Sequence, residues 1–75
     1  MEYTTYPYRI EHRDDDLTWY LGTFRSIRAG VDALAVAGRH LAEKDEHGYV
    51  VLIDQIERLD REVKRCDLPV WQVES

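Results

Sequence analysis

The stretch that decides the fold is YVVLIDQIERLDREVKRC, residues Tyr49 to Cys66. Its apolar residues recur by threes and fours, like the a and d positions of a heptad. The apolar positions are Tyr49, Leu52, Ile56, Leu59, Val63 and Cys66. The charged positions on the opposite side are Asp54, Glu57, Arg58, Arg61, Glu62, Lys64 and Arg65. This pattern predicts one amphipathic helix over the whole stretch.

The first five residues of the stretch also allow a second interpretation. Tyr49–Ile53 is rich in β-branched residues, which favours a third strand. Asp54 would then cap a shorter helix, and Glu57, three residues later, would complete a capping box. The length of the heptad pattern favours the long helix, which is our main prediction, and the strand stays open as the alternative.

A helix is also predicted upstream of this stretch. Ser26 is a suitable N-cap, because its hydroxyl can accept from a free N–H group of the first turn. An apolar stripe follows at helical spacing, formed by Ile27, Val31, Leu34, Gly38 and Leu41. A row of small residues lies beside it, namely Ala29, Ala33 and Ala37. We expect the helix to end near His47, with Gly48 as its C-terminal cap.

The N-terminal third has the alternating pattern of a β-hairpin. The first strand is predicted from Tyr3 to Arg13, and because Pro7 cannot donate to a ladder, the strand lies at a sheet edge or Pro7 lies at a bulge. Asp14-Asp15-Asp16 forms the tip, and Leu17–Phe24 forms the second strand. Strict alternation places Leu17, Trp19, Leu21 and Thr23 on one face and Thr18, Tyr20, Gly22 and Phe24 on the other.

These elements predict one α+β domain over residues 1–75. A β-hairpin is followed by two antiparallel helices and a short C-terminal tail that begins after Leu68-Pro69. Trp71 in that tail is expected to pack on the domain or on a partner. The alternative is a three-stranded sheet of order ββαβα, with Tyr49–Ile53 as its third strand.

Length and composition limit what holds this domain together. A chain of 75 residues buries only roughly 60% of its unfolded surface, so its core is marginal. Cys66 is the only cysteine, which excludes an intrachain disulfide and a zinc site built on several thiolates. Good helix packing or self-association could then support the domain, and we expect a homodimer.

The location expected from the sequence is the cytoplasm. A lone thiol suits a reducing compartment. No apolar run approaches the roughly 20 residues of a membrane span. The start of the chain has neither the basic residues nor the apolar centre of a signal peptide.

Residues with catalytic or metal-binding chemistry are few. The adjacent side chains of Asp14, Asp15 and Asp16 diverge, whereas calcium loops space their ligands at alternate positions. His40, Glu43 and His47 share a helix side, but the second predicted helix offers no histidine to complete a di-metal site. Cys66 lies on an apolar stripe. We therefore predict no cofactor, no metal and no enzymatic activity.

The segment from Trp19 to Ala37 resembles the last strand and helix of two DNA-reading modules. These are the arm-binding domain of phage-type integrases and the plant ethylene-response-factor domain. The resemblance implies a small sheet in the major groove with a helix behind it. This chain departs from both, because they have three strands before the helix and line the sheet with Arg and Lys.

The function predicted from the sequence is protein binding by a small acidic module. Its net charge of −5 disfavours nucleic acid, because phosphate binding depends on Lys and Arg. Such compositions are common among phage or mobile-element accessory proteins, some of which inhibit host complexes. The expected protein-binding residues are Tyr20, Phe24, Tyr49, Ile53 and Trp71.

The alternative function is DNA binding by the hairpin. The discriminating feature is the placement of four arginines, Arg9, Arg13, Arg25 and Arg28. One shared face favours DNA, whereas scatter favours protein.

Overall fold

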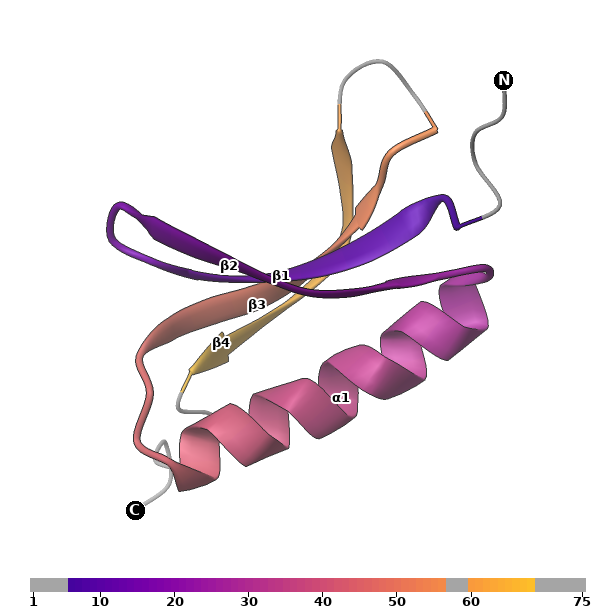
Figure 1. The fold of residues 1–75 in the computed structure, drawn as a ribbon. Helices are drawn as coiled ribbons and strands as arrows, with labels where there is room; N and C mark the ends of the chain where they lie inside the picture. The colour runs from indigo at the N-terminus through magenta and orange to yellow at the C-terminus, as the bar shows by residue number, and fades with distance from the viewer. Residues whose placement is uncertain (1–5, 57–59, 69–75) are drawn as a thin grey trace.

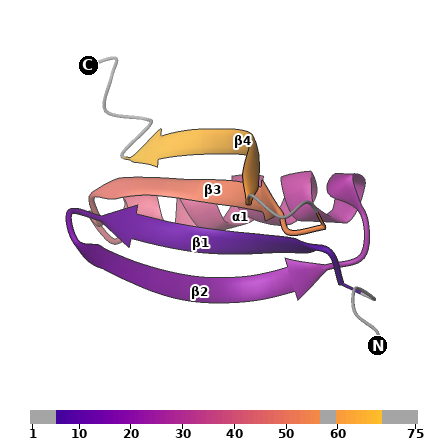
Figure 2. The same cartoon turned by 90° about the horizontal axis from the view of Figure 1, so that it is seen from above.

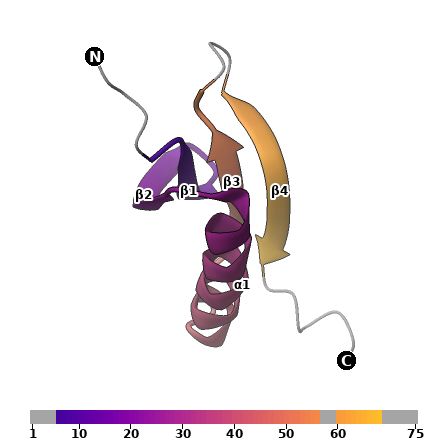
Figure 3. The same cartoon turned by 90° about the vertical axis from the view of Figure 1, so that its right-hand side faces the viewer.

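The computed structural model describes residues 6–56 and 60–68 and contains one sheet and one helix. The elements in chain order are β1 (Tyr8–Asp14), β2 (Leu17–Phe24), α1 (Ile27–Glu43), β3 (Gly48–Asp54) and β4 (Arg61–Leu68). The four strands are antiparallel and lie in the order β2-β1-β3-β4 (Figure 2). The sheet is strongly twisted, and α1 lies on one of its faces (Figures 1 and 3).

The prediction of two antiparallel helices is wrong. Tyr49–Ile53 lies inside β3, as the alternative proposed, and the strand extends by one residue at each end. The alternative fails beyond that point, because residues 61–68 form β4 and not a helix. In the described residues the chain is therefore an α+β domain of four strands and one helix. Glu57, Arg58 and Leu59, which were predicted to lie in the second helix, are outside the described residues.

The helical pattern misled because β3 is buried on both faces. Val50 and Leu52 belong to the face that α1 covers, and Val51 and Ile53 belong to the other face. All four side chains are at most 1% exposed. A strand buried on both sides has no polar alternation, so its period of two cannot be read from the sequence.

A bulge in β4 produced the rest of the false pattern. Leu52 pairs with Lys64 and Ile53 pairs with Glu62, which leaves Val63 as the extra residue. Val63 and Cys66 both pack against the core although they are three residues apart. The bulge thus gives two strand residues the spacing of a helix.

The start of α1 is as predicted, and its end is not. The amide of Ala29 donates to Ser26 Oγ at 3.1 Å, which makes Ser26 the N-cap. The helix ends at Glu43 with Lys44 as its C-cap, so Gly48 is not a helix cap. Gly48 instead opens β3 with a φ of +93°, and a Cβ there would lie 2.0 Å from the carbonyl oxygen of Arg13.

The contact between α1 and the sheet is unusually close. The buried row of the helix is Gly30, Leu34, Gly38 and Ala42. It differs from the predicted stripe, since Ile27 is half exposed. A Cβ added at Gly30 would lie 2.6 Å from Leu52 Cδ1, so glycine allows the backbone to reach β3. Leu34 joins Ile10, Val50 and Leu52 to form the core.

The hairpin is confirmed with changed details. β2 has the predicted bounds, but the predicted three-residue tip is shortened to Asp15-Asp16, because Asp14 ends β1, and Asp15 has a φ of 55°. β1 begins at Tyr8, after Pro7, and it is a central strand and not an edge. No helix in the described part of the chain is both long and apolar enough to cross a membrane.

Candidate functional site

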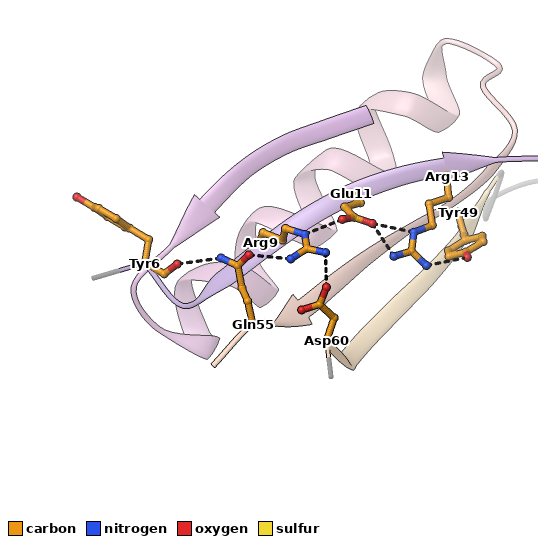
Figure 4. A network of polar contacts seen from close by, with 7 residues as sticks. All are labelled: Tyr6, Arg9, Glu11, Arg13, Tyr49, Gln55 and Asp60. Carbon is orange, nitrogen blue, oxygen red and sulfur yellow. Dashed lines mark hydrogen bonds and ion pairs between the residues drawn. The ribbon is translucent and has the colours of Figure 1, made fainter. Parts of the chain in front are cut away.

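The sheet face away from α1, here called the open face, carries an ion cluster centred on the buried Glu11 (Figure 4). Glu11 is 2% exposed and receives an arginine on each side from its own strand. Arg9 Nε donates to Glu11 Oε2 at 2.6 Å, and Arg13 Nε donates to Glu11 Oε1 at 2.8 Å. The three alternate along β1, so they share one face.

The two arginines also reach partners on other elements. Arg9 donates to Gln55 Oε1 at 2.7 Å and to Asp60 Oδ2 at 2.8 Å, which ties β1 to the residues after β3 and before β4. Arg13 Nη1 donates to the hydroxyl of Tyr49 on β3 at 3.4 Å. The cluster therefore links three strands of the sheet across its open face.

The electrostatics of the cluster keep both arginines charged. Burial lowers the pKa of Arg9, but hydrogen bonds and charges from Asp60 and Glu11 outweigh it, so that pKa is raised. Hydrogen bonds to Tyr49 and Glu11 raise the pKa of Arg13 in the same way.

The cluster is fully occupied by its own contacts. Within residues 6–56 and 60–68, every buried side-chain nitrogen and oxygen atom has a hydrogen-bond partner. A ligand would have to replace existing ion pairs instead of meeting unsatisfied groups. The cluster is therefore a structural part of the sheet and not a ligand site.

The β2 edge is the most apolar exposed part of the described chain. β2 lies at the end of the sheet and contains no charged residue in LTWYLGTF. Half of the exposed large hydrophobic residues belong to it, namely Leu17, Trp19, Tyr20 and Leu21. Tyr20 is 72% exposed and Leu17 is 58% exposed. These four residues and their strand are called the β2 edge below.

The helix does little to cover this part of the sheet. α1 lies mainly behind β3 and β4, as the view onto the open face shows (Figure 2). Trp19, on the α1 side, stacks on His12 with ring centroids 4.8 Å apart and stays 43% exposed. His12 is itself held by a hydrogen bond from Nε2 to the carbonyl oxygen of His47 at 2.8 Å. The stack therefore presents a rigid aromatic side to solvent.

The opposite edge, β4, has a contrasting composition. Five of the eight residues in REVKRCDL are charged: Arg61, Glu62, Lys64, Arg65 and Asp67. Arg65 lies over the ring of Tyr49 at 3.8 Å and pairs with Asp67 at 3.0 Å. Charged side chains on an edge strand oppose pairing with another strand.

The predicted binding residues on β2 lie on different faces. Leu21 is an extra residue, because Ile10 pairs with Gly22 while Glu11 pairs with Tyr20. This bulge puts Tyr20 on the open face and turns Phe24 toward the core. The strict alternation predicted for β2 is therefore wrong, and Tyr20 and Phe24 do not share a surface.

The other predicted binding residues are separate from the β2 edge. Tyr49 is half-buried on the open face beneath Arg65. Ile53 is 1% exposed and offers no surface. Trp71 lies outside the described residues. Sequence reasoning missed Leu17, Trp19 and Leu21 as binding candidates, although the absence of charge throughout Leu17–Phe24 was a signal for them.

The residues considered for metal or thiol chemistry are spread out. His40 and Glu43 lie in the C-terminal part of α1, whereas His47 follows the helix. Asp14 ends β1, and the next two aspartates form the turn. In the described ranges, no three His, Cys, Asp or Glu side chains are grouped so that they could hold a metal ion. Cys66 is half-buried beside Gly38 of the helix.

The outer side of α1 carries a shallow hollow of small residues. It is lined by Ala29, Asp32, Ala33, Val36, Ala37 and His40. The hollow is wide open to solvent and belongs to one helix, so nothing in it fixes the orientation of a ligand.

Comparisons of this chain with family models, curated proteins and solved structures found no match.

Proposed function

We propose that this chain is a non-enzymatic protein-binding module and that the β2 edge is its binding element. The observation that carries the proposal is an edge strand without charge whose four large apolar side chains are exposed. An edge strand has unpaired N–H and C=O groups along one side, which a strand from a partner protein can satisfy. The side chains on both faces of the strand then add apolar contact.

The placement of the arginines supports protein binding over DNA binding. Arg9 and Arg13 share the open face, but both pair with Glu11, and Arg9 also pairs with Asp60. Arg25 follows β2 and lies over the ring of Tyr6, and Arg28 is on α1. These four arginines are scattered or already paired, so they form no continuous surface for a phosphate backbone.

The remaining features also support a binding role over catalysis. The Ser26 hydroxyl serves as a helix cap, and Cys66 packs against α1. A cytoplasmic location belongs to the proposal, because the lone thiol suits a reducing compartment. The role of a phage accessory protein or inhibitor of a host complex rests on the acidic composition alone.

Affinity capture from an extract of the native cells tests the proposal. The bait is compared with the variant Thr18→Glu/Thr23→Glu, which places two carboxylates on the β2 edge. We expect a partner retained by the unaltered chain to be lost by this variant. The control is Arg61→Gln/Lys64→Gln, which lowers the net charge by the same amount on β4 and should retain the partner.

The same proteins answer the DNA alternative. We expect no binding to duplex DNA below about micromolar concentration at physiological salt, because affinity depends on the number of phosphates neutralised. A gel shift at nanomolar protein that weakens steeply with salt would favour the hairpin as a DNA-binding element. Capture that is equal for all three baits would reject the β2 edge as the binding element.

A further inference from the structure

We infer that the partner of the β2 edge is a second copy of this chain, bound by antiparallel pairing of the two β2 strands about a two-fold axis. The inference rests on the proposed function and names its partner. It predicts one continuous sheet of eight strands, with β2 of each copy at its centre. Three observations support it.

The first observation is the distribution of charge along the chain. Charged residues make up 33% of the sequence, yet Leu17–Phe24 is its longest run without Asp, Glu, Lys or Arg. The next longest uncharged run is residues 47–53, which includes the first six residues of β3. β3 is a central strand, and its side chains from Val50 to Asp54 are buried. By composition, β2 is therefore suited to the middle of a sheet.

The second observation concerns the choice between two copies and a different protein. The chain has a net charge of −5, and a partner selected by charge would contact charged side chains. β2 has none, so it can select a partner only by backbone pairing and apolar contact. The β2 strand of a second copy meets this condition, because it is itself uncharged. Pairing of the two strands therefore places no charged residue of either β2 in the contact.

The third observation is that the two edges of the sheet differ. Pairing of β2 with β4 of the next copy would be head-to-tail and would continue into a fibre. The five charges of β4 oppose that pairing. Both edge strands contain a bulge, at Leu21 and at Val63, so charge is what distinguishes them. Pairing β2 with β2 leaves both β4 strands outside and closes the assembly at two copies.

Sedimentation velocity of the purified full chain tests the inference. At about 100 µM, where interfaces of modest size associate, we expect twice the monomer mass. Thr18→Glu/Thr23→Glu should sediment as a folded monomer. Thr18 and Thr23 are both exposed, so their replacement removes no buried contact from the domain. Arg61→Gln/Lys64→Gln should remain a dimer.

Amide hydrogen exchange of the unaltered chain locates the interface and does not depend on the variant folding. At high concentration the outward amides of β2 should exchange at least tenfold more slowly than at low concentration. The amides of β4 should exchange equally at both. A dimer without added protection in β2, or a monomer at 100 µM, overturns the inference.

Sedimentation and affinity capture together distinguish failure of the inference from failure of the proposed function. A monomeric chain whose captured partner is lost in the Thr18→Glu/Thr23→Glu variant rejects the second copy and keeps the β2 edge as a binding element. A monomeric chain whose capture does not change in that variant rejects both.

Discussion

The two faces of this sheet bury their central residues by different chemistry. On the face under α1, Val50 and Leu52 pack with Leu34 and Ile10 in an apolar core. On the open face, Val51 and Ile53 are equally buried, but their neighbour Glu11 is charged and is held by Arg9 and Arg13. A domain this small can therefore bury both sides of a strand with the one helix of its described residues, because the charges on the other side are paired.

The different chemistry implies different responses to mutation. Apolar packing loses stability in proportion to the volume removed, and the surrounding residues relax partly. An ion cluster responds to the loss of its buried member, because the remaining charges stay partly desolvated and lose their shared partner. Four variants test this contrast.

The largest effect is expected for Glu11→Ala on the open face. It removes the buried carboxylate that Arg9 and Arg13 share and leaves both half-buried guanidinium groups short of a partner, so it should lower the free energy of unfolding by about 3–5 kcal/mol. Urea denaturation measures this loss. Since domains of this size seldom exceed about 3–5 kcal/mol in stability, Glu11→Gln, which retains an acceptor, serves as a milder companion.

The control for that variant is Glu62→Ala on the exposed β4 edge. It should change stability by no more than about 0.5 kcal/mol, as surface substitutions usually do. Equal effects of the two substitutions would show that burial of Glu11 has no energetic consequence.

The next effect is expected for Leu34→Ala on the α1 face. Leu34 is 1% exposed at the centre of the core, and its truncation should cost about 2–5 kcal/mol through lost burial and the cavity left behind. Thermal or urea denaturation measures it. Val36→Ala on the same helix is the control, because Val36 is 64% exposed, and a similar loss in both variants would contradict the described packing of α1.

A smaller effect of opposite sign is expected when Arg9, Glu11 and Arg13 are all replaced. Arg9→Leu, Glu11→Met and Arg13→Leu together remove every member of the triad and its desolvation penalty. Stability should be unchanged or higher by up to about 4 kcal/mol. A triple variant as unstable as Glu11→Ala would show that the charges themselves stabilise the open face.

The smallest effect is expected for Arg65→Ala. Arg65 is also on the open face and also forms an ion pair, with Asp67, but it is exposed and its pair is screened by water. We expect a Tm shift near the limit of detection by circular dichroism. A large decrease in Tm would mean that an ion pair on the open face stabilises the domain even when it is exposed.

The sequence was sufficient to identify the three elements of the first half of the fold, but not the central place of β1, the bulge in β2 or the end of α1. Alternation, the acidic turn and the Ser26 cap are local signals, and each identified its element. The second half depended on contacts that the sequence does not display. β3 lost its alternation through burial on both faces, and β4 gained a helical spacing through the bulge at Val63.

The candidate site was predictable only in part. Tyr20 was identified because it is a large apolar residue on a predicted strand, and it is exposed as expected. Phe24 was assigned to the same surface because a bulge such as that at Leu21 cannot be read from one sequence. The alternation of Arg9, Glu11 and Arg13 is visible in the sequence. Their ion cluster also depends on Gln55 and Asp60, which lie far along the chain.

The order of strands also has a consequence for how the chain folds. β1–β2 and β3–β4 are pairs of strands adjacent in sequence, whereas β1–β3 is the junction between them and is separated by β2 and α1. Local hairpins close quickly, and distant pairings must first overcome the entropy of the intervening loop. The junction where Glu11 meets Val51 should therefore set the folding rate, and each hairpin alone should be too small to remain folded.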